Sequence, residues 1–353
     1  MRYTIFGESH GPAIGVVIQD LPSGIALDME EIAREMARRA PGNSPLATAR
    51  REKDVPEILS GLFEGQTTGT PLCAMIANTD QHSGDYDDIR RYPRPGHADY
   101  TGFMRYQGCA DHRGGGHFSG RLTAPLVFAG AVAKQMLAAE GITIGAHIRS
   151  IAGIEDLPFA NREKPLTPPL LRELNRMAFP VLWTERGEEM QAEILKAKSE
   201  GDSVGGTIEC AVTGLPAGMG APDLGENVEG IVSRHVFAVP GVKAIGFGDG
   251  FGFAYLRGSQ ANDSLRMRMG EVVSDTNHSG GINGGITNGL PLVFEVALRP
   301  TASIAREQQT VDLENWTNAT ITVKGRHDPC IVQRAVPVIE AAAALAVCEV
   351  MNI

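Results

Sequence analysis

Glycine is the residue that most constrains how this chain can fold. The 353-residue sequence contains 42 glycines, about 12% of the chain against roughly 7% in average proteins. They occur in short clusters without a fixed period, which argues against a collagen-like fibre. Because glycine has no Cβ, it lets the main chain turn sharply and approach another group closely. The clusters therefore predict places where the backbone comes close to a ligand.

The overall composition is that of an ordinary globular protein, with 42% hydrophobic and 21% charged residues. The sequence has no Pro- or Ser-rich linker and no break in composition, so we expect one domain over residues 1–353. The formal net charge of -10 argues against a nucleic-acid partner. An anionic small molecule is compatible with that charge, because one pocket can be basic on an acidic protein.

Cysteine usage and the N-terminal sequence both predict a cytoplasmic location. The five cysteines are odd in number and none forms a Cys-x-x-Cys pair, so neither a disulfide framework nor a zinc ribbon is expected. The first residues lack the apolar segment of a signal peptide. No stretch is expected to approach the roughly 20 apolar residues of a membrane span. The most apolar run, Ala335 to Met351, contains Glu340 and Glu349, and we expect no membrane partner.

The pattern of apolar residues predicts an α+β fold. Helical spacing, starting after the N-cap residue Asp28, predicts helices over 29–39, 123–140, 170–177, 185–198, 228–238 and 336–351. Short apolar runs predict strands over 3–6, 14–18, 55–63, 70–77, 207–212, 292–298 and 319–323. We also expect a hairpin at 246–252 and a long functional loop over 79–120. Strands and helices do not alternate regularly, which disfavours a doubly wound parallel sheet.

Two of the glycine-containing motifs carry histidine. Residues 7–11 (Gly-Glu-Ser-His-Gly) place Ser9 and His10 between glycines, where His10 could exchange a proton near neutral pH. A tight turn with a surface histidine is the alternative. Residues 94–99 (Arg-Pro-Gly-His-Ala-Asp) bring His97 and Asp99 together, either as an oriented base or as two metal ligands. A solvated ion pair on a loop is the alternative there.

Three further segments contain groups suited to anions. Residues 114–121 place a glycine triplet, Ser119 and Arg121 before a predicted helix, where backbone N–H groups can bind an anion. Residues 299–303 supply a cation and two hydroxyls that could hold a phosphate. Asp328 precedes a proline, which favours extended geometry for its backbone. Together these groups suit a multiply anionic substrate and a phosphate-bearing cofactor, with acid and base groups nearby.

Together the motifs resemble the chorismate synthase family. The likeness covers the whole chain, with motifs at 7–11, 94–99, 114–121, 277–281, 299–303 and 325–330 in the family's order. The resemblance implies a helical layer sandwiched between antiparallel sheets, assembled as a homotetramer. It implies a carbon–oxygen lyase that removes phosphate and a proton from 5-enolpyruvylshikimate 3-phosphate to give chorismate. Reduced FMN is the implied cofactor, and it is not consumed.

The resemblance also implies roles for individual residues. The implied catalytic residues are Ser9, His10, His97, Ser119 and Asp328. The implied FMN-binding residues are His117, Phe118, Ser119, Ala238, Gly284, Arg299, Pro300, Thr301, Ala302, Ser303 and Arg326. The implied substrate-binding residues are His10, Arg39, Arg94, Arg121 and Arg326. No metal is implied.

The sequence departs from the family pattern at three places and leaves alternatives open. His117 and Phe118 stand where many members carry Arg and Ser, and Pro45 stands where many have arginine. The stretch around Phe237 and Ala238 is less polar than is usual in the family. Either NADPH acting on this enzyme or a separate flavin reductase could supply the reduced flavin. A metal-dependent phosphohydrolase and a non-catalytic flavin- or phosphate-binding protein are the two competing functional hypotheses.

Overall fold

The computed structural model describes residues 1–42, 46, 52–79, 88–160, 166–323 and 327–353. Within these residues the strands form two main antiparallel sheets. The first has the order β1-β2-β6-β3, with β1 at Arg2–Gly7, β2 at Ala13–Gln19, β6 at Leu72–Ala77 and β3 at Glu57–Ser60. The second has the order β10-β15-β9-β7-β8, with bounds Val242–Phe247, Leu292–Leu298, Gly206–Thr213, Thr143–Ile151 and Ile154–Glu155.

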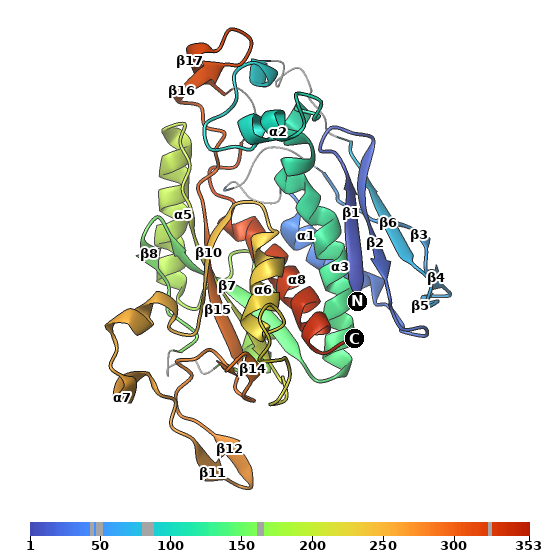
Figure 1. The fold of residues 1–353 in the computed structure, drawn as a ribbon, viewed down its shortest axis with the longest axis vertical. Helices are drawn as coiled ribbons and strands as arrows, with labels where there is room; N and C mark the ends of the chain where they lie inside the picture. The colour runs from blue at the N-terminus through green and yellow to red at the C-terminus, as the bar shows by residue number, and fades with distance from the viewer. Residues whose placement is uncertain (43–45, 47–51, 80–87, 161–165, 324–326) are drawn as a thin grey trace.

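A layer of helices lies between the two sheets (Figure 1). It contains α1 (Met29–Arg39), α3 (Thr123–Ala139), α6 (Val228–Phe237) and α8 (Val332–Val350). Helix α3 contacts β1, β2 and β6 on one side, and α8 contacts β7 and β9 on the other. Helices α4 (Pro168–Leu174) and α5 (Thr184–Ser199) pack against the second sheet from outside. The predicted α+β fold with a sandwiched helical layer is therefore confirmed.

The helical layer is held together by close packing and by one buried carboxylate. Most side chains of α3 are buried, and a Cβ at Gly130 would lie only 2.2 Å from the Cβ of Ala341 on α8. Glu340 is fully buried and accepts hydrogen bonds from Arg38 at 2.6 and 2.8 Å and from Lys134. Because a buried charge needs partners, this carboxylate fixes α8 against α1 and α3.

Helix α3 corrects one expectation drawn from the sequence. The segment Gly120–Ala139 has a mean hydropathy of 1.4 and is long and apolar enough to cross a membrane, by length and composition alone. In the structure 72% of it is buried inside the protein. A helix that is apolar on all sides is typical of the centre of a core as well as of a membrane span.

The largest differences between predicted and observed elements are in three places. The expected hairpin at 246–252 is wrong, because β10 ends at Phe247, pairs with β15, and is followed by a 3₁₀ helix, η4, at Gly250–Tyr255. The segment 88–122 contains α2 (Asp99–Arg105) and the 3₁₀ helices η2 (Arg113–Phe118) and η3 (Gly120–Leu122), where a loop was predicted. Helix α8 begins at Val332, before its predicted start at 336.

Small hairpins and one projecting segment complete the chain. The hairpins are β4–β5 (Leu62–Phe63, Gln66–Thr67), β13–β14 (Ile282–Asn283, Ile286–Thr287) and β16–β17 (Glu307–Asp312, Thr317–Thr322). Residues 250–273, here called the projecting arm, contain η4, α7 (Gly258–Ala261), β11 (Arg266–Arg268) and β12 (Glu271–Val273) and extend away from the sandwich (Figure 1). The arm exposes apolar side chains, among them Phe251, Tyr255, Leu265, Met267 and Met269.

Candidate active site

A cavity of about 670 Å³ lies where the start of α3, the N-terminal part of α8 and several loops meet. Its volume falls in the range of roughly 300–1,000 Å³ that is usual for small-molecule sites. Cationic side chains dominate its polar lining, with Glu52 and Asp328 as the acidic ones. The cations come from segments far apart in the chain: Arg39, Arg94, Arg121, Lys243, Arg299 and Arg334.

The segment 94–99 places an oriented histidine in the cavity wall. Arg94 binds the carboxylate of Asp99 through Nε and Nη2, each at 2.7 Å. Asp99 also accepts from the backbone N–H of Arg94 at 3.0 Å, and its Oδ1 lies 2.7 Å from Nδ1 of His97. A carboxylate at Nδ1 favours the tautomer with its proton on Nδ1, so Asp99 sets the orientation of the His97 ring.

The segment 299–303 is fixed against the segment 94–99. Arg94 Nη1 donates to Ser303 Oγ at 3.0 Å, and Arg299 donates to the carbonyl of Gly96. Gly96 has a φ of 74°, and a Cβ there would lie 2.4 Å from the Arg299 guanidinium, so only glycine allows this approach. Thr301 also lines the cavity, and its Oγ1 is buried without a hydrogen-bond partner in the described structure.

The glycine triplet forms a thin part of the cavity wall, with His10 behind it. Gly114, Gly115 and Gly116 all have positive φ. A Cβ at Gly114 would lie 2.3 Å from Cδ2 of His10, and one at Gly115 would lie 3.1 Å from Cε1 of His97. His10 is 4% exposed and is not part of the cavity lining, although Gly114 is. The triplet therefore lets two histidines approach the same stretch of backbone.

Asn78 ties the turn at residues 7–11 to the cavity. Its Nδ2 donates to the carbonyls of Glu8 and Gly11 at 3.0 and 2.8 Å, and its Oδ1 accepts from Nε of Arg121 at 3.0 Å. Ser9 in this turn is fully buried, and its Oγ has no hydrogen-bond partner in the described part of the chain. The turn is thus buried beside the cavity, in contrast to the alternative of a surface histidine.

Two arginines with buried counter-ions occupy one side of the cavity. Arg39, the last residue of α1, lies 2.6 Å from Asp54, and Arg121 contacts Asp54 and also lies 3.2 Å from Glu52. Burial, together with the nearby guanidinium groups of Arg334 and Arg121, lowers the pKa of Arg39 to about 10, and Asp54 opposes this shift. Arg39 therefore remains cationic at neutral pH.

Asp328 enters the cavity from the N-terminal side of α8. It forms a 2.6 Å ion pair with Arg334, whose Nε also donates to the carbonyl of Arg39 at 3.1 Å. Nearby Cys330 is buried, and burial raises the pKa of its thiol to about 12. A thiol of this kind is a packed side chain rather than a nucleophile.

The structure brings together most of the residues that the sequence singled out. The following line the cavity: Arg39, Arg94, His97, His117, Phe118, Ser119, Arg121, Ala238, Arg299, Pro300, Thr301, Ala302, Ser303 and Asp328. Ser9 and His10 lie behind Gly114, and Gly284 lies in the β13–β14 turn, outside the lining. Arg326 and Pro45 lie outside the described residues.

Sequence reasoning missed several charged residues of this region. Glu52, Lys243 and Arg334 line the cavity, and Asp54 lies behind two of its arginines. None of them belongs to a glycine-containing motif. Arg334 lies just before the predicted helix over 336–351 and within the observed α8, and the sequence offered no local signal for any of these residues.

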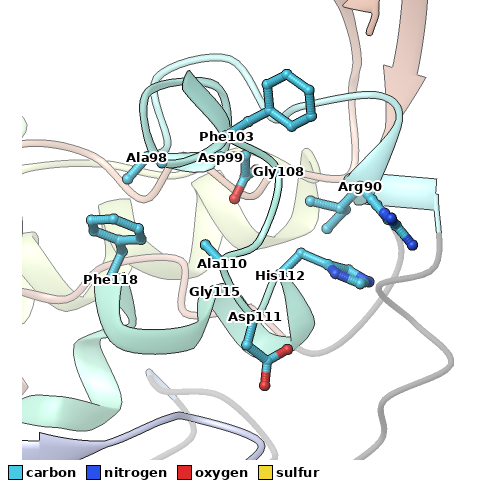
Figure 2. Close-up of a pocket in the computed structure, with 12 residues that line it drawn as sticks. Arg90, Ala98, Asp99, Phe103, Gly108, Ala110, Asp111, His112, Gly115 and Phe118 are labelled. Carbon is cyan, nitrogen blue, oxygen red and sulfur yellow. The ribbon is translucent and has the colours of Figure 1, made fainter. Parts of the chain in front are cut away.

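A second pocket is lined by residues that include Asp99, His112, Gly115 and Phe118 (Figure 2). Its volume is about 40 Å³, which is enough for a few water molecules but not for a substrate. Ala98 and Phe118 border both pockets. The large cavity is therefore the candidate active site.

The residues required by the metal-site hypothesis do not form a metal site in the part of the chain that the structure describes. The hypothesis needs His97, Asp99, His112 and His117 around one ion, but no group of three or more His, Cys, Asp or Glu side chains in the described structure could hold a metal. His117 instead lies with Nδ1 3.0 Å from the carbonyl of Gly7. The geometry thus favours the anion-binding interpretation.

The fold and the site define a class: a protein with a β-α-β sandwich and an arginine-lined cavity of a size and charge suited to an anionic small molecule. Residues 1–351 match the family model for chorismate synthase. A chorismate synthase from Aeropyrum pernix is 45% identical over 99% of this chain and 90% of its own length. One from Thermococcus kodakarensis is 43% identical over 99% and 95%. A crystal structure of a chorismate synthase superposes with a TM-score of 0.75 at 28% identity, covering 99% of this chain and 91% of the other.

The chain belongs to the chorismate synthase family. It is accordingly an enzyme of the carbon–oxygen lyase class.

Proposed function

We propose that the enzyme converts 5-enolpyruvylshikimate 3-phosphate into chorismate and inorganic phosphate, with reduced FMN bound beside the substrate. The reaction breaks the carbon–oxygen bond to phosphate, removes a proton from carbon 6 of the ring and leaves a conjugated diene. One observation carries the proposal: a single cavity gathers several arginines together with the His97–Asp99 and Asp328–Arg334 pairs. A substrate with a phosphate and two carboxylates needs such a set of cations.

The residues around 299–303 fit the phosphate-bearing end of a flavin mononucleotide. Arg299 and Ser303 supply a cation and a hydroxyl, and the buried Oγ1 of Thr301 lacks a partner in the described structure. A buried hydroxyl without a partner costs free energy, so a ligand atom there would stabilise the protein. Bound reduced flavin would supply electron density that helps the phosphate leave.

The remaining groups position the substrate and hold protons. Arg39, Arg121 and Arg334 would neutralise the substrate's phosphate and carboxylates and orient its ring. His97, oriented by Asp99, would hold a proton at the cavity wall, and Asp328 would do so from the side of α8. We assign His10 and Ser9 a supporting role behind Gly114, from where a small shift of the glycine triplet would bring them to the ligand.

Anaerobic turnover tests the proposal. Purified protein with chemically reduced FMN and 5-enolpyruvylshikimate 3-phosphate is expected to release phosphate and form chorismate in equal amounts. Oxidised FMN under the same conditions serves as the control, and an added chelator should have no effect. Release of phosphate without chorismate, or without flavin, would favour the phosphohydrolase instead.

Two variants separate the lyase from a non-catalytic flavin-binding protein. A binding protein would retain FMN in His10→Ala and His97→Ala, with no turnover to lose. The lyase should lose most of its turnover in His97→Ala while FMN affinity changes little. Repeating the assay with NADPH and oxidised FMN, with no added reductase, distinguishes reduction on this enzyme from supply by a separate flavin reductase.

We further propose that the enzyme is a cytoplasmic homotetramer. The apolar side chains exposed on the projecting arm support an assembled state, because a large exposed apolar patch is unusual on a monomer. The five unpaired cysteines support a reducing compartment. Sedimentation equilibrium measures the mass, and a monomer at micromolar concentration would contradict the assembly.

A further inference from the structure

Asp54 is a buried acid that touches two cavity arginines at once. Its Oδ2 accepts from Nη1 of Arg39 at 2.6 Å, and its Oδ1 accepts from Nη1 of Arg121. The Asp54 side chain is 0% exposed, and the two arginine side chains are 5% and 3% exposed. The carboxylate does not line the cavity, although both arginines do. It therefore contacts them from behind the wall.

The backbone at Asp54 is held in an unusual conformation. Its φ of 49° lies in the left-handed region, which costs an ordinary residue free energy and is tolerated best by Gly, Asn and Asp. The residue lies in the segment before β3, where residues 52–56 have no regular secondary structure. The chain thus accepts a local strain that turns one carboxylate toward two guanidinium groups.

The two guanidinium groups are anchored at other points as well. Arg39 donates from Nε to Thr123 Oγ1 at 3.1 Å and from Nη2 to the carbonyl of Gly120 at 3.0 Å. Arg121 donates from Nε to Asn78 Oδ1 at 3.0 Å. Asp54 is the acceptor that these two arginines share. Two like charges so close together repel each other, and a shared anion between them both reduces the repulsion and fixes their relative orientation.

We propose that Asp54 is a positioning residue: it holds Arg39 and Arg121 as a preformed receptor for the anionic groups of the substrate. This inference rests on the proposed function, since it assigns the organisation of the substrate side of the same cavity. Preorganised donors bind an anion without first losing conformational entropy. Without Asp54, the arginines separate, and the substrate must order them when it binds.

Two substitutions distinguish positioning from a simple charge effect. Asp54→Asn removes a negative charge beside the site, so a purely electrostatic role predicts a lower KM for the anionic substrate. Asp54→Glu keeps the charge and moves it, so the same role predicts an unchanged KM. Positioning predicts that both variants raise KM by roughly tenfold to a hundredfold, with kcat changed by less than about threefold.

Asp312→Asn is the matched control. Asp312 is 5% exposed and binds Arg91 at 2.9 Å, away from the cavity. The Asp312→Asn variant should have a lower unfolding temperature than wild type and an unchanged KM. Thermal unfolding of every variant identifies those that fold. If one of the two Asp54 variants does not fold, the other decides the question.

Titration of the substrate-free enzyme with inorganic phosphate separates this inference from the proposed reaction. Wild type should bind phosphate more tightly than Asp54→Asn and Asp54→Glu by the same factor that separates their KM values. If wild type binds phosphate in this way but forms no chorismate, the proposed function fails and the positioning role stands. Unchanged or tighter phosphate binding by both variants would overturn the role of Asp54, whatever the reaction.

Discussion

At the scale of single residues, acids determine how the cations and the histidine of the cavity are arranged. Asp54 joins Arg39 to Arg121, Asp99 joins Arg94 to His97, and Asp328 holds Arg334. Although burial opposes it, hydrogen bonds from Arg94 and His97 hold the pKa of Asp99 well below its usual range. Asp99 therefore stays ionised throughout the neutral range and keeps accepting the Nδ1 proton of His97.

Asp99→Asn should reduce kcat by about a hundredfold, the scale of an impaired acid–base group. An amide in this place offers one acceptor atom instead of two, so it cannot hold both Arg94 and His97. Because the Asp99 carboxylate lies behind the ring, KM for the substrate should change by less than about threefold. Steady-state kinetics measures both constants. A rise in KM with unchanged kcat would show that Asp99 acts only through Arg94.

At the scale of elements, the contact between α3 and α8 places the cavity, because both helices begin at it. Gly130 on α3 allows this contact, since its position faces the backbone and Cβ of Ala341. Helix interiors normally disfavour glycine by about 1 kcal/mol relative to alanine. The close packing of the two buried helices offsets that free-energy cost.

Gly130→Ala should destabilise the protein by about 1–3 kcal/mol, because the added methyl overpacks the helix interface. Gly258→Ala on the projecting arm is the control, since no heavy atom lies within 4 Å of its Cβ position. Denaturant unfolding measures both. Equal stability of the two variants would mean that α3 and α8 can separate at little cost.

A second element-scale feature is a buried His147 between two acids. Its ring nitrogens lie 3.0 Å from Asp156 and 2.9 Å from Glu209. The same acids accept backbone N–H groups of Leu182, Trp183 and Phe159. The histidine on β7 therefore fastens the segments on the outer face of the second sheet, around α4 and α5, to the strands beneath.

The stability contribution of His147 should fall as the pH rises. Burial lowers its pKa, but the two carboxylates outweigh burial and raise it above the usual value of about 6.5. Its contribution is thus complete below about pH 6.5 and is lost as the pH passes through the raised value. Each tenfold gain in proton affinity is worth about 1.4 kcal/mol. Comparing the pH dependence of unfolding in wild type and His147→Gln measures the contribution.

The stability contribution of His235 should depend on pH in the opposite direction to that of His147. Burial lowers the pKa of His235 despite a hydrogen bond with Glu349. Its contribution should therefore be lost as the pH falls. If His147→Gln and His235→Gln changed the pH dependence in the same direction, the proposed protonated state of His147 would be wrong.

The elements that were predicted correctly are those with local signals. Helix α1 follows the N-cap Asp28, whose side chain accepts from Glu30 and Glu31, and ends at Arg39 as expected. Strand β7 was missed because glycine, histidine and arginine interrupt its apolar pattern. The hairpin expected at 246–252 was wrong because β10 pairs with β15, a strand far along the chain. Pairing between strands that are distant in the sequence produces no pattern in the sequence of either strand alone.

The same distinction holds for the candidate site, where residues with a local sequence signal were predicted and residues defined by distant contacts were not. Motifs that contain glycine and histidine pointed to much of the polar lining of the cavity, because such residues mark unusual backbone close to ligands. The shared acid Asp54 could not be found this way, since its partners Arg39 and Arg121 come from other segments. Ser9 and His10, which the resemblance implies as catalytic, are not part of the cavity lining and lie next to Gly114.

At the scale of the whole molecule, the cavity joins parts of the chain that are distant in sequence. One hydrophobic core includes residues of both sheets and of the helices between them, which supports the expectation of one domain. The cavity lies beside this core, and its arginines come both from residues 39–121 and from residues 299–334. A multiply charged ligand bound there would contact both parts of the chain.

Binding of an anion should therefore stabilise the whole protein. A ligand that binds only the folded state adds about 2.7 kcal/mol at a hundred times its Kd, so inorganic phosphate or the substrate should raise Tm by several degrees. Arg39→Lys and Arg121→Lys should reduce this rise, because lysine cannot reproduce the paired N–H donors of arginine. Arg2→Lys is the control, since Arg2 is exposed and pairs with Asp20 far from the cavity. An equal rise in Tm in all three variants would show that the anion binds elsewhere. It would contradict the proposal that the cavity is the substrate site.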